Sequence, residues 1–471
     1  MAKLCKPFLN RRRFLKSAAG FSASVPLMSG LMAQNAFAAD TAGYKALVCL
    51  TFKGGIDGSD LLMPIDAAAH ADFRGVRADL LDSYADNSRQ RENLLSVGLA
   101  EDGLEYGLPG ELAPMQALFN DNKAAIVANV GTLVEPTNRT LFHSTSTLPR
   151  KLFSHNDQQS IWLTGDVEGL APGYGGRFMD AVYASDPGHN RIYGALGLTS
   201  SRHGYLTGQT ARGLVIPTGE PDRLRLVSNR SKMSWIAAQD DAYNALMAEH
   251  LRQGGLAPAS PYARDLTDMA RRGMDNIDFY NQTMEGAPDV TSAVTTIAQQ
   301  FAKIAQTAAM ASSFGVTRQV FYVQAPGGFD THAAQAGQQS RLRDTAAAIA
   351  EFMSSLSALG LQDNVTLFTA SDFGRTLSTN GNGSDHGWGS HHFVVGGAVK
   401  GGQIIGSPPP YDNLSEQYTD SRMRLIPDIS VDQYVNTLGR WFGLNTTDLG
   451  TILPNLSNFD APVLDLFNVA V

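Results

Sequence analysis

Carboxylate and imidazole side chains gather in one glycine-rich stretch of the chain, residues 327–402. It contains GGFDTH, SDFGRT and GNGSDHGWGSHH in that order, and it holds four of the ten histidines. Carboxylates and imidazoles are the ligand types for Zn²⁺, Mn²⁺ and related divalent ions. The glycines allow sharp turns and a close approach of the backbone to a ligand. This stretch therefore predicts a metal site.

Three residues of the stretch are the first predicted ligands. Asp330 and His332 stand two residues apart after an apolar, strand-like run. In an extended loop both side chains point the same way and suit one ion. The alternative is a turn aspartate beside a surface histidine. His386, on a glycine-flanked loop, is the third predicted ligand, whereas His391 and His392 enter HHFVV, where strand alternation lets only one of them face a given side.

Asp372 and Arg375 follow another apolar run, VTLFTAS. Asp372 is predicted as a metal ligand, and the alternative is a helix N-cap. Arg375 carries a guanidinium fork that suits phosphate, sulfate or carboxylate, and Arg177 in GYGGR is predicted to assist it. The alternative for Arg375 is an ion pair that holds its loop.

An activated nucleophile is expected at the start of a helix, where the helix dipole assists it. Ser154 occupies such a position in FSHNDQQ, and the alternative is that it only caps the helix. The sequence contains no GxSxG elbow and no HExxH helix. It also lacks a P-loop and a GxGxxG in a strand–helix context, so nucleotide-cofactor chemistry is not expected.

Strand-like and helix-like segments alternate along the chain, which predicts an α/β sheet. In such sheets the ligand lies outside the carboxyl ends of the strands. Asp57, Asp330 and Asp372 each stand at or just past such an end, so we expect these acids to meet in one crevice. The expected strands are 45–52, 124–130, 318–324, 364–369 and 393–395, and the expected helices are 112–120, 153–163, 291–313 and 340–359.

The N-terminus is typical of a twin-arginine export signal. It has three arginines at 11–13, a short apolar run, and Ala-Phe-Ala at 36–38. The run is too short and too rich in Ser and Gly to span a bilayer, which takes roughly 20 apolar residues. We therefore predict a signal over 1–38 and a periplasmic or secreted location. Residues 39–471 are expected to form a single α/β domain without a membrane span, with a helix-rich insertion at about 223–285.

Composition narrows the class of protein. The formal net charge is −8, and the predicted signal removes only basic residues, so the mature chain is more acidic still. Such a chain is a poor binder of nucleic acid and is not attracted to anionic lipid. Its apolar fraction of 43% is ordinary and predicts a globular protein with a large core. Cys49 remains alone after the signal, on an apolar strand where a thiol is inert.

The order of the motifs carries a family resemblance. The leader is followed by FKGGIDGSDLLMP, SHNDQQSIWLTG, GYGGR, GGFDTH, DFGRT, DHG and VVGGAVKGG. Over nearly the whole mature chain this resembles the domain-of-unknown-function 1501 family of exported bacterial proteins, which is similar to the alkaline phosphatase/sulfatase superfamily. The resemblance implies a mostly parallel central sheet with helices on both faces. It also implies one or two divalent metals held by Asp and His on strand-end loops, and cleavage of phosphate or sulfate esters.

The resemblance assigns metal roles residue by residue. Asp57 resembles the superfamily's first-strand metal acid. Asp330 and His332 resemble its Asp…His pair. Asp372 and His386 resemble its later Asp and His, although here a glycine-rich insertion separates them.

The resemblance also bears on the nucleophile. The helix that ends in Trp-Leu-Thr-Gly is similar to the nucleophile helix of alkaline phosphatases. The spacing from Trp162 in that family lands on His155, with Ser154 one residue earlier. Both residues are therefore predicted to be catalytic.

These predictions combine into an exported metal-dependent hydrolase of a phosphate or sulfate ester. The ion, Zn, Mn, Mg or Ca, is expected to polarise the ester, Arg375 and Arg177 to bind the anion, and Ser154 or a metal-bound water to attack. The substrate would be a small or polymeric anionic ester. The alternative is a catalytically degenerate hydrolase fold that acts as an envelope binding or assembly module. The resemblance implies an exported partner protein for it.

Overall fold

The computed structural model describes residues 39–469, except 170, 200–202, 220–241, 243, 244, 247, 251 and 253–259. The predicted signal and much of the first half of the predicted insertion lie outside the described residues. Those that are described fall in one compact unit, Ala38–Val471. Among them, no helix has the length and apolar character needed to cross a bilayer.

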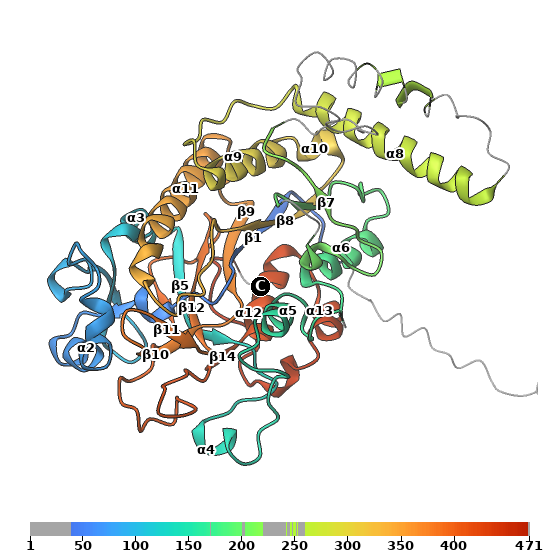
Figure 1. Cartoon of the computed structure of the whole chain (residues 1–471). Coiled ribbons are helices and arrows are strands. Elements are labelled where there is room, and N and C mark those ends of the chain that lie inside the picture. The colour runs from blue at the N-terminus through green and yellow to red at the C-terminus, as the bar shows by residue number, and fades with distance from the viewer. Residues whose placement is uncertain are drawn as a thin grey trace, which may run out of the picture. The chain divides into compact units, whose positions relative to one another are not determined.

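A nine-stranded sheet organises this unit (Figure 1), with the strand order β13-β5-β12-β9-β1-β8-β6-β7 and β14 beside β5. Only β12 runs against its neighbours, β5 and β9; the other pairings are parallel. The expectation of a mostly parallel central sheet is confirmed. The strands are β1 (Lys45–Phe52), β5 (Ala124–Gly131), β6 (Ala195–Gly197), β7 (Leu214–Val215), β8 (Arg318–Gln324), β9 (Val365–Ser371), β12 (Ser390–Val395), β13 (Ile404–Ile405) and β14 (Ile429–Ser430).

The alternating side chains of β1 divide the core into two layers. Val48 and Leu50 belong to one buried cluster, and Leu47 and Cys49 belong to the other. Both faces of the strand are therefore apolar, as is typical of a parallel sheet covered on both sides. Burial raises the pKa of the Cys49 thiol far above its usual value, which keeps it unreactive at neutral pH.

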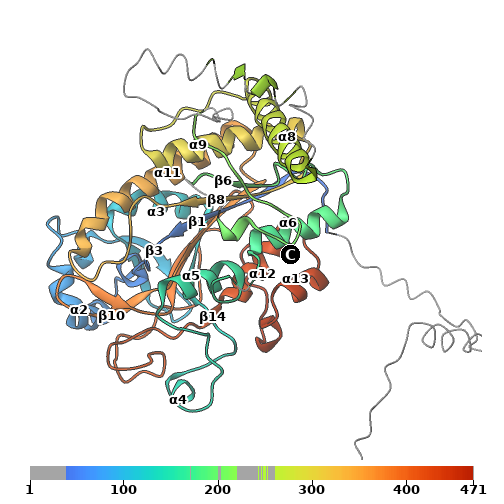
Figure 2. The ribbon, with the colours of Figure 1, turned by 45° about the vertical axis from the view of Figure 1, so that its right-hand side comes forward.

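Helices cover both faces of the sheet, and Figure 1 and Figure 2 show the two layers. The first cluster includes side chains of α3 (Ala113–Asn120), α9 (Thr296–Ala309) and α11 (Gln339–Ala358). The second includes side chains of α5 (His155–Thr164), α6 (Tyr174–Ser185), α12 (Val431–Phe442) and α13 (Thr446–Ile452). The expectation of helices on both faces is thus confirmed.

Smaller elements complete the fold. One small sheet has the order β2-β4-β3, and another pairs β10 with β11. The second half of the predicted insertion is one long helix, α8. The bounds are β2 (Met63–Pro64), β3 (Leu95–Leu99), β4 (Glu105–Leu108), β10 (Arg375–Thr379), β11 (Ser384–His386), α2 (Ala67–Leu81), α4 (Arg139–Phe142), α8 (Pro261–Met284) and α10 (Ala311–Phe314).

The topology brings distant loops to one edge of the sheet. In parallel register, β1 lies between β8 and β9, with Thr51 opposite Gln324 and Ala370. These three strands therefore end at the same edge, and the antiparallel β12 begins there. The loops that follow β1, β8 and β9 emerge side by side, together with the loop that precedes β12.

Asp432, in the first turn of α12, is a buried carboxylate with few partners. Only 6% of the residue is exposed. Its Oδ1 accepts a hydrogen bond of 3.4 Å from the Tyr174 hydroxyl, and its Oδ2 has no hydrogen-bond partner among the described residues. Burial raises its pKa to about 6, although a backbone N–H of Asn455 and Tyr174 oppose the shift. Between about pH 4 and pH 6, the Asp432 carboxyl therefore holds a proton in the folded state that it has released in the unfolded chain.

This carboxyl is expected to make stability fall as the pH rises from about 4 to about 6, because there the folded state binds more protons than the unfolded one. The Asp432→Asn variant carries no titrating group, so it should exceed the wild type at pH 8 by roughly 2–3 kcal/mol, and the difference should vanish near pH 4. Denaturant unfolding across this range measures it. The exposed Asp460→Asn is the control, and a constant difference between wild type and Asp432→Asn would contradict the assignment.

Candidate metal and catalytic site

Gly54 connects the three strand-end loops. Its N–H donates a 3.0 Å hydrogen bond to Oδ2 of Asp372, and its carbonyl accepts one of 3.3 Å from Arg375. Its φ is +107°, and a Cβ placed there would lie 2.6 Å from the backbone nitrogen of Asp330. Only glycine fits this approach without displacing the backbone. The GG sequence after β1 is therefore required for the loops to meet.

A strained turn carries the chain into α5. Lys151 and Phe153 have φ of +50° and +70°, a region that bulky side chains rarely adopt. Such strain persists only where the surroundings impose it, and it is common at functional sites. Here it places the carbonyl of Phe153 2.9 Å from Nδ1 of His386. The turn thus connects the start of α5 to β11.

Three imidazoles are oriented by acceptors on their Nδ1 atoms. Nδ1 of His155 lies 2.9 Å from Oδ2 of Asp372, and Nδ1 of His332 lies 3.0 Å from Oδ1 of Asp385. Nδ1 of His386 faces the Phe153 carbonyl. Because carboxylates and carbonyls only accept, each Nδ1 must carry the proton. When the rings are neutral, each Nε2 then carries a free lone pair.

These Nε2 lone pairs converge. Nε2 of His386 lies 3.1 Å from Nε2 of His155 and 3.1 Å from Nε2 of His332. Unprotonated nitrogens at this distance repel one another unless a cation or a proton lies between them. An acceptor on the far nitrogen is also how metal-bound histidines are usually held.

Asp330 supplies the carboxylate of the cluster, and its two oxygens face different histidines. Oδ1 lies 3.0 Å from Nε2 of His332 and 3.3 Å from Nε2 of His386, while Oδ2 lies 3.4 Å from Nε2 of His155. Ligand-type atoms of His155, Asp330 and His386 all lie within 4.8 Å of one another. Asp330 and His386 therefore form two overlapping triads, one with His332 and one with His155.

The local charges favour an anionic Asp330 and a neutral His386. Burial alone raises the pKa of Asp330, but the hydrogen bond and charge of Arg375 outweigh it and bring the pKa below its usual value. Burial lowers the pKa of His386, and the charges of His155 and Arg375 lower it further. The hydrogen bond to Asp372 raises the pKa of His155. A carboxylate and neutral imidazoles are the forms in which these side chains bind metals.

The structure brings together four of the five residues proposed from the sequence as ligands. Asp330, His332 and His386 are in direct contact, and Asp372 lies behind His155. Asp57 is elsewhere: its Oδ2 forms a buried ion pair with Arg77 and accepts a 2.7 Å hydrogen bond from Gln335. A guanidinium thus neutralises the acid for which a metal was expected.

The residues proposed as catalytic are also separated. His155, the first residue of α5, lies in the cluster. The hydroxyl of Ser154 donates to Oδ2 of Asp157 at 2.9 Å, and no hydrogen bond to the backbone caps the helix. Arg177 donates to the carbonyls of Thr164 and Ile452, which are the last residues of α5 and α13.

Arg375 lies at the cluster, and both of its terminal guanidinium nitrogens are hydrogen-bonded within the protein. It donates a 2.8 Å hydrogen bond to Oδ1 of Asp330 and also binds the carbonyls of Gly54 and Ser384. Its side chain has no exposed surface. This is the alternative considered for it, an ion pair that holds a loop. Neither Arg375 nor Arg177 presents a free guanidinium to an anion at the cluster.

His391 and His392 lie within β12, away from the cluster. Both are buried, and burial lowers their pKa values to about 4 and about 3. Nδ1 of His391 accepts a 3.0 Å hydrogen bond from the backbone of Asn129, and Nδ1 of His392 lies 3.1 Å from the Thr369 hydroxyl. These histidines are neutral parts of the core.

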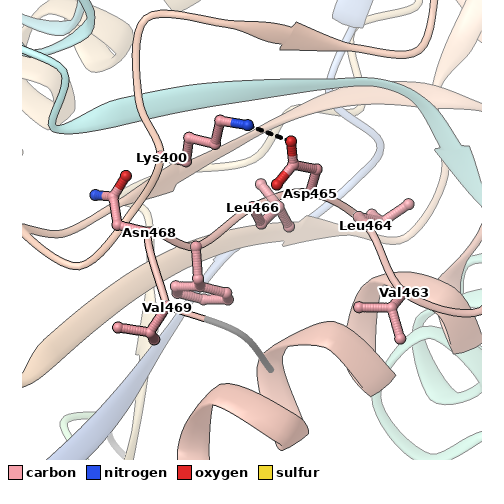
Figure 3. Close-up of a pocket in the computed structure, with 8 residues that line it drawn as sticks. Lys400, Val463, Leu464, Asp465, Leu466, Asn468 and Val469 are labelled. Carbon is pink, nitrogen blue, oxygen red and sulfur yellow. Dashed lines mark hydrogen bonds and ion pairs between the residues drawn. The ribbon is translucent and has the colours of Figure 1, made fainter.

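The cavity of about 500 Å³ shown in Figure 3 is a separate feature. It is lined by Lys400 and residues 463–469, and no residue of the histidine cluster lines it. Its two opposite charges, on Lys400 and Asp465, are paired with each other. Among the residues that the structure describes, the side chains grouped closely enough to hold a metal ion are those of the cluster.

Comparison with known proteins gives one family match. Residues 44–425 match the model of a family described as a protein of unknown function, DUF1501. A search of the curated proteins finds no match.

Several solved structures are similar at low identity. A lipoteichoic acid synthase from Listeria monocytogenes is 10% identical, with a TM-score of 0.32 and coverage of 91% of this chain and 76% of that one. A phosphonate monoester hydrolase from Silicibacter pomeroyi is 10% identical, with a TM-score of 0.32 and coverage of 85% and 74%. A sulfatase from Pseudoalteromonas sp. is 11% identical, with a TM-score of 0.33 and coverage of 88% and 70%. Activity has to be argued from the residues of this chain itself.

Proposed function

The chain belongs to the DUF1501 family, and we propose that it is an exported metal-dependent hydrolase of a phosphate or sulfate ester. The observation that carries the proposal is the convergence of Nε2 lone pairs on one carboxylate. His332, His386 and Oδ1 of Asp330 have mutual distances of 3.0–3.3 Å. Ligands of a tetrahedral ion bound at 2.0–2.2 Å are separated by roughly 3.3–3.6 Å, so this triad fits a divalent ion.

We assign Asp330, His332 and His386 as the ligands. A tetrahedral ion held by these three residues would keep one open position, as catalytic zinc sites do. When bound there, a divalent cation supplies Lewis acidity to an ester oxygen. Zn²⁺ and Mn²⁺ suit this mixture of imidazole and carboxylate better than Ca²⁺ or Mg²⁺, which prefer oxygen ligands.

The other residues of the site position this triad. Asp385 and the carbonyl of Phe153 hold the Nδ1 protons of His332 and His386 and so direct their Nε2 atoms inward. Arg375 fixes Oδ1 of Asp330. Asp57 is not assigned to the metal, because Arg77 already neutralises it in the core. Asp372 is assigned as the partner of His155.

The test uses the purified mature chain. We expect Zn²⁺ or Mn²⁺ to copurify or to bind on addition, and the loaded protein to hydrolyse a p-nitrophenyl phosphate, phosphodiester or sulfate. Metal analysis and release of p-nitrophenol measure the two parts. Bound metal without turnover across the panel would favour the envelope binding module. The absence of both across Zn²⁺, Mn²⁺, Mg²⁺ and Ca²⁺ would overturn the proposal.

A further inference from the structure

The side chain of His155 is oriented as a nucleophile would be, rather than only as a metal ligand. Its Nδ1 donates to Asp372, whose residue is 2% exposed and whose Oδ2 also accepts from Gly54 at 3.0 Å. A buried carboxylate held in this way fixes the ring and its tautomer. In the neutral ring, Nε2 is left with a directed lone pair. An imidazole with a carboxylate on its far nitrogen is the arrangement that stabilises an imidazolium when Nε2 takes up a bond.

Nε2 of His155 approaches the cluster from the side of the second oxygen of Asp330. It lies 3.4 Å from Oδ2, whereas His332, His386 and Arg375 contact Oδ1. The triad assigned to the metal is therefore complete without His155. His155 remains adjacent to it, 3.1 Å from His386. A group bound to the metal would lie within reach of this lone pair.

Two other nucleophilic side chains, those of Ser154 and Cys49, do not share this placement. The Ser154 hydroxyl donates to Asp157, and Cys49, the free cysteine of the described chain, is buried in β1. The side chain at the N-cap of α5 leaves the N–H groups of the first turn uncapped. These N–H groups and the helix dipole favour an anionic group at the His155 end of the helix.

We propose that Nε2 of His155 is the nucleophile of a phosphoryl transfer, so that the substrate is a phosphate ester and the enzyme passes through a phosphohistidine. This rests on the proposed function and selects phosphate over sulfate. In the first step Nε2 forms a bond to phosphorus, and the bond from phosphorus to the ester oxygen breaks. The leaving alkoxide takes a proton from solvent water and departs as the alcohol. In the second step a water oxygen bonds to phosphorus, the N–P bond breaks, and its electron pair returns to Nε2. The attacking water releases a proton to solvent, and inorganic phosphate leaves with the imidazole restored.

Asp372 is the positioning residue of this chemistry. While the N–P bond exists, the ring carries added positive charge, and the carboxylate on Nδ1–H stabilises it. His155→Asn removes Nε2 but retains an amide that can still donate to Asp372. Ser154→Ala is the matched control, because it changes the adjacent residue and the other nucleophile considered at this helix start.

The experiment mixes the metal-loaded mature chain with p-nitrophenyl phosphate, quenches one sample in alkali and a second in acid within the first turnover, and maps the adduct in each by mass spectrometry. Alkali preserves a phosphohistidine, whereas acid destroys it and preserves a phosphoserine. We expect a phosphoryl group on His155 in the wild type and in Ser154→Ala. His155→Asn should show no adduct, lose turnover by more than about 1,000-fold, and bind metal as the wild type does.

Three results would overturn the inference while leaving the proposed function standing: turnover with no adduct on His155, an adduct on Ser154, or His155→Asn that still turns over. Loss of metal in His155→Asn as complete as in His332→Ala would reassign His155 as a ligand and also overturn it. If the wild type neither binds metal nor turns over, the proposed function fails first, which metal analysis reports separately.

Discussion

Replacing His386 with alanine is expected to remove metal binding and to reduce ester turnover to background. His386 has the largest effect because its Nε2 contacts both other imidazoles and Oδ1 of Asp330. Its loss opens the centre of the cluster and leaves His155 and His332 without their shared neighbour. Loss of a ligand should exceed the roughly 10–100-fold drop in metal affinity that follows loss of an orienting partner. Calorimetric titration with Zn²⁺ measures the affinity.

Two variants make this test specific. Asp385→Asn removes only the charge that holds Nδ1 of His332, so its metal affinity should fall by the smaller factor of about 10–100. His143→Ala removes an exposed histidine outside the cluster and should bind metal normally. Wild-type affinity in His386→Ala would show that the convergence of the imidazoles serves some purpose other than metal binding.

Replacing Arg77 with methionine is expected to destabilise the folded state strongly. Arg77 and Asp57 are both buried, and the guanidinium also donates to the carbonyls of Thr376 and Leu377 at 3.4 and 3.2 Å. Arg77→Met would leave the Asp57 carboxylate without its counter-charge, and breaking a buried pair from one side costs about 3–5 kcal/mol. The free energy of unfolding in guanidinium chloride measures the loss.

A double variant separates the charge from the packing. Arg77→Met combined with Asp57→Asn removes both charges and should recover part of the stability, because exchanging a whole buried pair for neutral groups is often tolerated. Arg74→Met on the same helix breaks a more exposed pair with Asp82 and should cost no more than about 1 kcal/mol. If Arg77→Met were as mild as Arg74→Met, Asp57 would not depend on its ion pair.

Local pattern predicted the elements that are built from uninterrupted apolar runs. The bounds of β1 and β8 agree with the expected strands, and α11 differs from its expected range by one residue at each end. Strand β12 is three residues longer than expected, because His391 and His392 are polar and yet buried. Their burial depends on hydrogen bonds with the Asn129 backbone and the Thr369 hydroxyl, which no local pattern contains.

The sequence predicted which residues lie near one another at the site, but not the role of each residue. Strand-end position placed Asp330 and Asp372 correctly at one edge, because parallel strands end together. Strand-end position also suggested Asp57 as a metal ligand, but the partner of Asp57 is an arginine on α2. Pairing between distant elements cannot be recognised in a local run of sequence. The contact between Asp372 and His155 joins residues 217 positions apart. Because of this contact, the Asp372 carboxylate faces the imidazole of His155.

The Nδ1 contacts have a consequence for which ion the protein carries. Because Asp372, Asp385 and a backbone carbonyl aim the rings, little of the chain has to become ordered when an ion enters. A preorganised site of this kind imposes no folding step that could reject one borderline metal in favour of another. Intrinsic affinity would then follow the general order of the divalent metals, and the metal found in the protein would reflect supply in the compartment where folding is completed.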